Sequence, residues 1–259
     1  MTPIFSVHND HIKALARLAA KPAERRSSGQ LLLEGIHLLD AYLARHTQVE
    51  EVLIQTDALS HPEVHALRRR LPASCRQVEV NTAVMAKLSS LSTPGELVAV
   101  VALPAPPAEP EQGSILLLEA VQDPGNLGAI LRTAAAAGIR QVWLSPHCAD
   151  PWSAKVLRAG MGAHFALDIR TDAELGDVLA GFAGPSLVTS LQASASLYAT
   201  DLRGRCAFVF GNEGAGVSAA LLAAASHPVR IPMPGEAESL NVAAAVAVCL
   251  FEQVRQQLG

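Results

Sequence analysis

The sequence predicts an α/β protein: a mostly parallel sheet with helices on both faces, preceded by a small α/β domain. Three observations predict this fold class. After residue 114, short continuous apolar segments alternate with helical segments, as expected for parallel strands that are buried on both faces. A proline-rich segment separates that alternation from the residues before it. Half of the 259 residues are hydrophobic and 17% are charged, which is typical of a globular chain.

Residues 1–102 form the predicted small N-terminal domain, and they contain no convincing active site. Helices are expected at His8–Leu18 and Ala83–Leu88, and an apolar stretch from Leu31 leads through Gly35 into a helix that ends near Ala44. Strands are expected at Glu51–Gln55, Cys75–Val80 and Leu97–Ala102.

Residues 103–113 form the predicted linker. Pro104, Pro106, Pro107 and Pro110 can neither pair into a sheet nor continue a helix, so an extended and fairly stiff segment is expected.

Residues 114–259 form the predicted C-terminal domain. In chain order, the expected strands are Ile115–Ala120, Val142–Leu144, Phe165–Ile169, Leu187–Ser190, Ala207–Phe210 and Val229–Ile231. The expected helices are Asn126–Ala137, Ser153–Arg158, Ala173–Phe182, Ala219–Ala225 and a long final helix from about Asn241. In such sheets, ligands bind at the loops beyond the carboxyl ends of the strands.

Composition narrows the classes of function and the compartment. The four cysteines are scattered without a CxxC pair, which argues against a zinc site and against disulfides and favours a reducing cytoplasm. Neither a signal peptide nor an apolar run of about 18 residues is present, so a membrane protein is not expected. A net charge of −4 is unfavourable for nucleic-acid binding, although a basic cluster lies within Lys13–Arg26. The simplest interpretation of that cluster is a solvated helix face.

The first loop that could contribute to a functional site follows the strand that ends near Ala120. Pro124 and Gly125 predict a turn, and Asn126 is suited to cap the next helix. Arg132 lies less than two helical turns further on, so it can project near the same end of the sheet as Asn126. A capped helix with a surface arginine is the alternative.

The second loop follows Ala207–Phe210 and contains Gly211, Gly214 and Gly216 around a polar pair, Asn212 and Glu213. Glycines permit positive φ and let a ligand approach the backbone closely. The loop matches neither GxGxxG nor a phosphate-binding GxxxxGK loop, and a purely structural turn is the alternative.

The third loop runs from Ile231 to Asn241, and Ser239 or Asn241 begins the last helix. The simplest interpretation makes Ser239 an N-cap. All three loops follow strand ends of one sheet, which favours a single site. That site has no His, Cys or Lys nucleophile and no paired carboxylates, so hydrolase, glycosidase and metal chemistry are poorly supported.

These loops resemble the signature motifs of the SpoU (TrmH-like) RNA methyltransferases, which belong to the SPOUT superfamily. N-x-G-x-x-x-R is matched by Asn126, Gly128 and Arg132, and G-N-E-x-x-G by Gly211, Asn212, Glu213 and Gly216. I-P-M-x-G-x-x-x-S-L-N-V is matched by Ile231, Pro232, Met233, Gly235, Ser239, Leu240, Asn241 and Val242. The resemblance covers residues 114–259, and Leu31–Leu39, with Glu34 and Gly35, is similar to the family's substrate-binding domain.

The resemblance implies a C-terminal trefoil knot, a homodimer with the site at the subunit interface, and S-adenosylmethionine as cofactor. It implies methyl transfer to a ribose 2'-hydroxyl, most favourably in ribosomal RNA, with transfer RNA as the alternative. DNA lacks that hydroxyl and is not expected as a substrate.

The resemblance also implies roles for individual residues. Cofactor binding is assigned to Gly211, Asn212, Ile231, Met233, Ser239 and Leu240, largely through backbone groups, and catalysis to Asn126, Arg132, Glu213, Ser239 and Asn241. A guanidinium is seldom deprotonated, so we expect Arg132 to stabilise negative charge on the 2'-oxygen rather than to act as a base.

Contacts with RNA are assigned to Lys155, Arg158, Arg25 and Arg26, with an exposed helix face as the alternative interpretation. Two further functions remain open. One is a non-catalytic RNA-binding or ribosome-assembly factor on the same fold, against which the intact motifs argue. The other is an unrelated nucleotide-binding enzyme, against which the absence of both phosphate-loop fingerprints argues.

Overall fold

The computed structural model describes residues 2–107 and 113–259, so part of the predicted linker, including Pro110, lies outside the described residues. The chain divides into two compact units. Residues up to Pro104, together with Asp150–Phe165, make up the first unit, and Ala105–Ala149 with Ala166–Gly259 make up the second. The segment Asp150–Phe165, which lies within the predicted C-terminal domain, therefore packs with the first unit.

The first unit is built on a five-stranded mixed sheet of order β1-β4-β3-β5-β2. Neighbouring strands β1, β4 and β3 are parallel, whereas β5 runs antiparallel to both β3 and β2. The strands are β1 (Thr2–Ile4), β2 (Gln30–Glu34), β3 (Glu51–Gln55), β4 (Arg76–Val80) and β5 (Leu97–Ala102).

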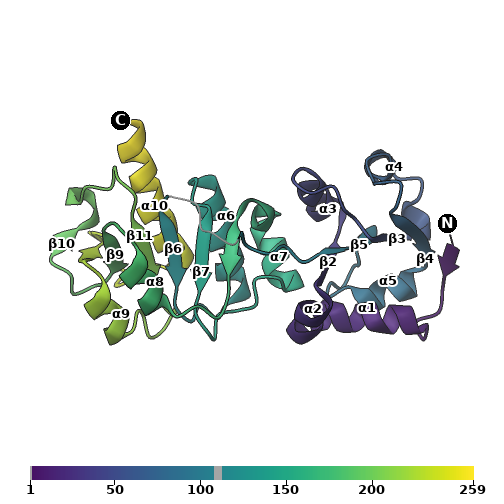
Figure 1. Ribbon diagram of the computed structural model, residues 1–259, viewed down its shortest axis with the longest axis horizontal. Helices are drawn as coiled ribbons and strands as arrows, with labels where there is room; N and C mark the ends of the chain where they lie inside the picture. Colours follow the sequence, from purple (N-terminus) through teal and green to yellow (C-terminus); the bar gives the residue numbers. More distant parts are fainter. Residues whose placement is uncertain (1, 108–112) are drawn as a thin grey trace. The chain divides into compact units, whose positions relative to one another are not determined.

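Helices cover both faces of this sheet (Figure 1). Side chains alternate along a strand, so Leu31 and Leu33 of β2 enter one apolar core and Leu32 enters the other. Helices α1 and α5 pack on the Leu32 face, and α3, α4 and α7 pack on the opposite face. The helices are α1 (Asp10–Ala20), α2 (Pro22–Ser28), α3 (Ile36–Leu43), α4 (Pro62–Arg68), α5 (Thr82–Leu88) and α7 (Ala154–Gly160).

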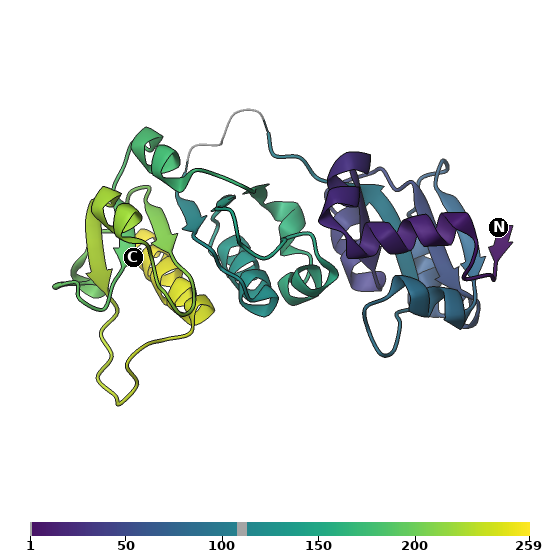
Figure 2. The same cartoon turned by 90° about the horizontal axis from the view of Figure 1, so that it is seen from below.

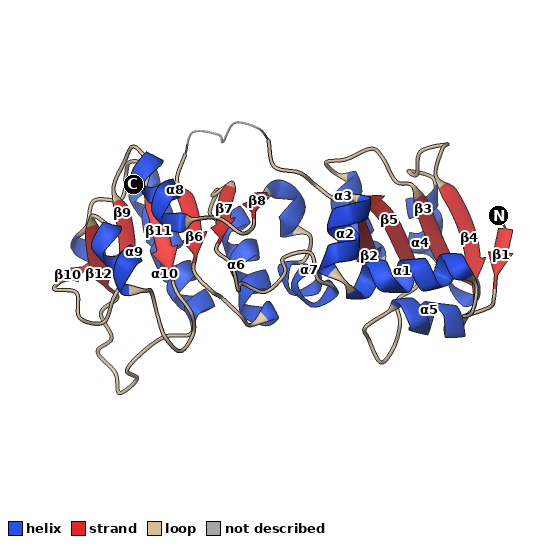
Figure 3. Ribbon diagram, turned by 60° about the horizontal axis from the view of Figure 1, so that its bottom comes forward, coloured by secondary structure: helices blue, strands red, loops and turns tan. Residues whose placement is uncertain are grey.

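The second unit is built on a seven-stranded parallel sheet of order β10-β12-β9-β11-β6-β7-β8 (Figure 3). Its central strands are fully buried, because helices lie on both faces. The strands are β6 (Ile115–Leu118), β7 (Gln141–Leu144), β8 (Asp168–Arg170), β9 (Ser186–Thr189), β10 (Ala195–Ser196), β11 (Ala207–Phe210) and β12 (His227–Arg230).

Helices α8 (Leu175–Gly181) and α9 (Ala219–Ala224) pack on one face of this sheet through a shared apolar core. Helices α6 (Pro124–Ala136) and α10 (Val242–Leu258) pack against each other on the opposite face (Figure 2). The predicted fold class, a mostly parallel sheet covered on both faces and preceded by a small α/β domain, is confirmed.

Several local predictions are corrected. Helix α6 begins at Pro124, not Asn126, because Asp123 is the N-cap: its carboxylate accepts the Asn126 N–H at 2.7 Å. Proline suits the first helical position because it fixes φ and no backbone N–H is needed there. The cap of α10 is Asn241, whose side chain accepts the N–H of Ala243, and not Ser239.

Other elements were not anticipated from the sequence. Helices α2 and α4 and strands β1, β2 and β10 were missed, and β8 begins at Asp168 after a short 3-10 helix at Ala163–Ala166. Within the part of the chain that the structure describes, we find no helix with the length and apolar character needed to cross a membrane.

Candidate active site

The three chemically interesting loops meet at one edge of the second unit's sheet. Strands β12, β9, β11 and β6 are consecutive neighbours and are all parallel, so their carboxyl ends lie side by side. The loops that follow β6, β11 and β12 are the ones that contain the motif residues.

A cavity of about 490 Å³ opens between these strand ends. Its volume falls within the range of about 300–1,000 Å³ that is usual for small-molecule sites. The lining includes all six residues predicted to bind the cofactor: Gly211, Asn212, Ile231, Met233, Ser239 and Leu240. Glu213 and Asn241 also line it, and Glu213 is the only charged residue in the described lining.

The glycine-rich loop leaves no room for a side chain at its first position. A Cβ atom at Gly211 would lie 2.1 Å from the carbonyl oxygen of Gly216 and 2.4 Å from the backbone nitrogen of Val217. The loop closes on itself through two backbone hydrogen bonds between Asn212 and Gly216, at 3.0 and 2.9 Å, and Gly216 has a φ of +71°. Glycine is therefore required at position 211 for the loop to close on itself.

The Asn212 side chain holds this loop together from within. Its Oδ1 accepts the N–H groups of Gly214 and Ala215 at 2.9 and 3.0 Å, and its Nδ2 donates to the carbonyl of Ala120 at 2.9 Å. These polar atoms are already engaged, so Asn212 can offer a ligand its backbone more readily than its side-chain amide.

Glu213 connects the glycine-rich loop to the start of α6. Its carboxylate accepts the N–H groups of Gln122 at 3.3 Å and Asp123 at 3.2 Å, and the Nδ2 of Asn126 at 3.1 Å. Partial burial raises the pKa of the Glu213 carboxyl, but the hydrogen bonds from Asn126 and from the backbone outweigh it, and the pKa falls below its usual value. Glu213 is therefore ionised at neutral pH.

Asn126 lies at the centre of a hydrogen-bonded chain across the three loops. Its Nδ2 donates to Glu213, and its Oδ1 accepts the Nδ2 of Asn241 at 2.9 Å. The Oδ1 of Asn241 is used to cap α10, so that amide has a fixed orientation. Asn126 keeps one N–H and one lone pair for a further partner.

Arg132 is not in the lining of the cavity. It lies six residues after Asn126, about 9 Å further along the axis of α6. Its side chain is exposed, and it forms no hydrogen bond or ion pair with any residue in 2–107 or 113–259. The structure therefore brings together four of the five predicted catalytic residues and leaves the guanidinium outside that group.

Two contributions to the site were missed from the sequence. Thr189, Ser190 and Leu191 line the cavity from the end of β9, and the predicted strand Leu187–Ser190 could have indicated this, since it ends at the same edge. Glu119 accepts the backbone N–H of Ser218 at 2.7 Å, which ties the far end of the glycine-rich loop to β6.

Arg25, predicted to contact RNA, is buried instead. It is 3% exposed, and its Nη1 donates to the carbonyl oxygens of Leu18 and Ala19, both at 2.8 Å. Its Nη2 forms an ion pair with Asp150. A guanidinium enclosed in this way holds the first unit together and is not exposed for a contact with the RNA backbone, so that prediction is corrected for Arg25.

The other candidate RNA contacts differ in accessibility. Arg158 is half-buried: its Nη1 donates to the hydroxyl of Ser90 at 2.9 Å and lies 3.6 Å from a carboxylate oxygen of Glu34. Lys155 and Arg26 are exposed. Neither side chain forms an ion pair with another of the described residues.

Comparison with known proteins agrees with this geometry. The model of the SpoU rRNA Methylase family matches residues 113–251, which contain all three loops. The model of the MRM3-like substrate binding domain matches residues 9–99 of the first unit.

Relatives align over almost the whole chain. An uncharacterized tRNA/rRNA methyltransferase of Synechocystis is 38% identical, with 98% of this chain and 94% of the relative covered. The 23S rRNA (guanosine(2553)-2'-O)-methyltransferase RlmP of Bacillus subtilis is 32% identical, with 97% and 98% covered.

Among solved structures, one described as an RNA 2'-O ribose methyltransferase superposes with a TM-score of 0.85 at 34% identity, and both chains are covered completely. The SpoU methyltransferase AviRb of Streptomyces viridochromogenes, in complex with AdoMet, gives 0.87 at 26% identity, with 97% and 99% covered. The trefoil knot stays a prediction of the resemblance. The family model matches more than half of the chain, and the relatives align along nearly all of it. The chain therefore belongs to the SpoU rRNA methylase family.

Proposed function

We propose that this chain transfers a methyl group from S-adenosylmethionine to a ribose 2'-hydroxyl of RNA, with ribosomal RNA as the favoured target. One observation carries the proposal. The cavity between the strand ends shares Glu213 and Asn241 with the hydrogen-bonded chain that fixes Asn126, so a bound small molecule and the polar groups beside it are held in one frame.

The cavity suits the cofactor in shape and charge. Gly211 and its neighbours offer bare backbone, Met233 and Leu240 offer apolar surface, and the carboxylate of Glu213 favours a cationic ligand. When bound, S-adenosylmethionine supplies a methyl group that its sulfonium makes electrophilic. Gly211, Ile231 and Leu240 would hold it through the backbone. Asn212, whose amide is already engaged, would act through its backbone as well.

The Asn126 side chain would form hydrogen bonds with the RNA 2'-hydroxyl. Its amide is oriented by Glu213 and Asn241, and its remaining donor and acceptor match a hydroxyl group, which both donates and accepts. Fixing a hydroxyl beside a reactive group lowers the entropic part of the barrier. Ser239 lines the same cavity and would contact either the cofactor or the ribose.

Arg132 would stabilise charge rather than move a proton. As the oxygen–methyl bond forms and the carbon–sulfur bond breaks, S-adenosylhomocysteine would leave and the proton of the 2'-hydroxyl would pass to solvent. A guanidinium stays protonated at neutral pH, so it suits the negative charge that develops on the 2'-oxygen or the adjacent phosphate. Because Arg132 is exposed and has no ion-pair partner among the described residues, its side chain is available to RNA.

A homodimer with the site at the subunit interface forms part of the proposal. Several large apolar side chains of the second unit are exposed: Leu191 at 54%, Tyr198 at 54%, Leu240 at 40% and Phe251 at 47%. Where such side chains lie together in one patch, a partner often covers them. Analytical ultracentrifugation tests this: the wild type should sediment as a dimer, and a Phe251→Asp variant should shift towards the monomer. A monomeric wild type at micromolar concentration would contradict the proposal.

The first unit would select the RNA. The proposed division places the substrate-binding domain at 1–102, the linker at 103–113 and the methyltransferase domain at 114–259. Arg26 and Lys155 remain exposed candidates for phosphate contacts. A target in ribosomal RNA would place the protein in the cytoplasm, where ribosomes are assembled in bacteria.

Methyl transfer with labelled S-adenosylmethionine tests the function. The purified chain is incubated with ribosomal RNA and, separately, transfer RNA from cells that lack it. We expect label in ribosomal RNA, in nucleotides that resist alkaline hydrolysis because the 2'-hydroxyl is blocked. Label in transfer RNA alone would establish the alternative target. Binding of RNA without transfer to either would favour a non-catalytic factor and overturn the proposal.

A further inference from the structure

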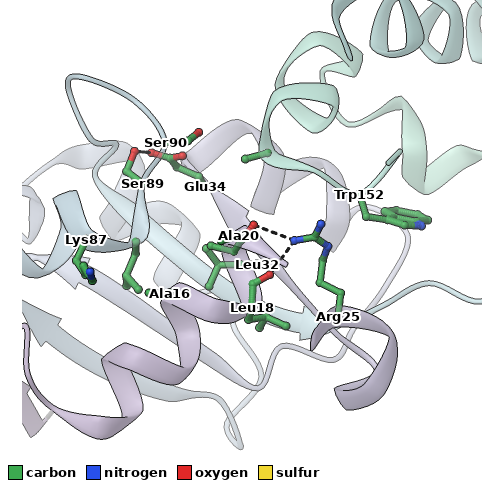
Figure 4. Close-up of a pocket in the computed structure, with 13 residues that line it drawn as sticks. Ala16, Leu18, Ala20, Arg25, Leu32, Glu34, Lys87, Ser89, Ser90 and Trp152 are labelled. Carbon is green, nitrogen blue, oxygen red and sulfur yellow. Dashed lines mark hydrogen bonds between the residues drawn. The ribbon is translucent and has the colours of Figure 1, made fainter. Parts of the chain in front are cut away.

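A second, smaller pocket lies within the first unit, where it plays no part in the chemistry above. It has a volume of about 140 Å³ and is formed by the end of α1, by Arg25 of α2, by β2, by the end of α5, and by Trp152 and Ala154 (Figure 4). We call it the Glu34 pocket. Its lining includes Ala16, Leu18, Arg25, Leu32, Glu34 and Lys87.

The size and walls of the Glu34 pocket suit one flat ring system. Its volume is below the range of about 300–1,000 Å³ that drug-sized ligands occupy. Leu18, Leu32 and Leu88 supply apolar surface, and the small side chains of Ala16 and Ala19 leave the space open. Apolar walls of this kind make contact with the faces of an unstacked nucleobase.

The polar group of the pocket is a buried carboxylate with spare acceptors. Glu34 is 9% exposed; the hydroxyl of Ser89 donates to its Oε1, and the Nη1 of Arg158 lies 3.6 Å from its Oε2. A carboxylate has about four acceptor positions, so most of those on Glu34 are not used by the described residues. Burial of an under-used acceptor favours a ligand that brings N–H donors.

Positive charge lies around the carboxylate. Figure 4 shows Glu34 and Ser89 on one side of the pocket and Arg25 on the other, with Leu32 between them. The buried Nε of Arg25 has no acceptor among the described residues. Lys87 is exposed, and no hydrogen bond or ion pair links it to the part of the chain that the structure describes. A free ammonium beside a ring-sized pocket is suited to a phosphate.

From these features we propose that the Glu34 pocket binds one unpaired guanine base of the RNA substrate, apart from the nucleotide that is methylated. This rests on the proposed function only in taking RNA as the substrate. Guanine presents two adjacent donors, N1–H and the 2-amino group, which a carboxylate can accept together. Adenine places a lone pair at N1, and uracil flanks its one N–H with carbonyls, so both fit a carboxylate less well.

Fluorescence anisotropy with labelled pentanucleotides tests the pocket in the full chain. The probes are UUGUU, UUAUU and UUIUU, in which inosine lacks the 2-amino group. The variants are Glu34→Gln, which keeps an acceptor for Ser89 but presents an N–H₂ group, and Ala16→Leu, which fills the pocket. Ala14→Leu, on the exposed face of the same helix, is the matched control.

We expect the wild type to bind UUGUU at least about fivefold more tightly than UUAUU, with UUIUU between them, since a bidentate base contact discriminates by that factor or more. Glu34→Gln should abolish the preference for guanine, and Ala16→Leu should weaken UUGUU binding while Ala14→Leu does not. Lys87→Gln should weaken all three probes equally, because it removes a phosphate contact.

Equal affinity of the wild type for UUGUU and UUAUU would overturn the proposal, as would unchanged UUGUU binding in both Ala16→Leu and Glu34→Gln. Ala16→Leu keeps the test decisive if Glu34→Gln fails to fold. The two proposals fail separately. Methyl transfer to ribosomal RNA without a preference for guanine in the binding assay would contradict only the proposal for the pocket. Guanine-selective binding without methyl transfer would contradict only the proposed enzymatic function.

Discussion

Replacing Glu213 with alanine should separate catalysis from cofactor binding. The change removes the acceptor of three N–H groups outside the glycine-rich loop, from Gln122, Asp123 and Asn126, at 3.1–3.3 Å. It also removes a longer contact of 3.5 Å from the amide of Asn212. Each such hydrogen bond contributes about 0.5–1.5 kcal/mol net, and water replaces part of it because Glu213 is exposed. At the lower end of that range, three hydrogen bonds together contribute about 1.5 kcal/mol to the free energy of unfolding. Their loss lowers the melting temperature by roughly 3–6 °C in a protein of this size.

The expected loss of activity is larger than the loss of stability. Asn126 would no longer have a fixed orientation, and a displacement of about 1 Å at a reacting group can reduce kcat about 100-fold. The dissociation constant of S-adenosylmethionine should change by less than about fivefold. Asn212 and Gly216 hold the glycine-rich loop without Glu213, and the attraction of an exposed carboxylate for the cationic cofactor is worth less than about 1 kcal/mol in water. The kcat of Glu213→Gln should lie between those of the wild type and Glu213→Ala, since its amide oxygen can still accept a hydrogen bond from Asn126.

Steady-state methyl transfer and calorimetric titration measure the two effects. Glu236→Ala is the matched control, because Glu236 is exposed and does not line the cavity. If Glu213→Ala weakens cofactor binding as much as it lowers kcat, Glu213 acts on the cofactor and the reasoning from Asn126 is refuted. A kcat within a few-fold of the wild type would refute it as well.

The pH dependence of stability gives an independent check on Glu213. Its pKa in the folded protein lies below the ordinary carboxyl value of 4.5. The stabilisation from its ionised form is therefore complete above about pH 4.5 and is lost as the pH falls through the lower, folded-state pKa. The difference in melting temperature between the wild type and Glu213→Ala should accordingly shrink in acid.

The remaining predictions concern the loop, the guanidinium and the buried ion pair. Gly211→Ala places a Cβ 2.1 Å from a backbone oxygen and should abolish cofactor binding by calorimetry, whereas Gly214→Ala, whose nearest contact is at 3.6 Å, should be tolerated. Arg132→Ala should reduce kcat by about 100-fold or more and leave cofactor affinity intact; equal losses would contradict the electrostatic role. Arg25→Met should lower the free energy of unfolding by about 2–4 kcal/mol, because it breaks a buried ion pair, and Arg26→Met by less than about 0.5 kcal/mol; equal effects in urea unfolding would mean that burial of Arg25 contributes nothing.

Local sequence patterns were sufficient to predict most of the strands and helices of the second unit. The apolar runs that became β6 and β11 are four residues long, are fully buried and lie between helices, as predicted for parallel strands. The same patterns were less reliable at element ends. Asp123 and Asn126 are both good N-caps by residue type, and only the position of Pro124 at the first turn shows which one is used.

Short polar elements were the main omissions. Helix α2 has seven residues, of which two are arginines and two are serines, so it has no apolar periodicity to detect. The Arg25 side chain fixes the position of α2 against α1, because its guanidinium donates hydrogen bonds to the carbonyl groups at the end of α1. Judged by composition, Arg25 and Arg26 look alike, and only burial distinguishes them.

The sequence by itself determined the alternation of strands and helices, the family motifs and the residue types at the site, because each depends on neighbours within a few positions along the chain. The tertiary structure alone decided which of these residues meet. Glu213 reaches Asn126 across 87 positions, and Arg25 reaches Asp150 across 125. The strand order β12-β9-β11-β6 brings the cavity loops together. Such contacts depend on how whole elements pack, and no local pattern encodes that packing.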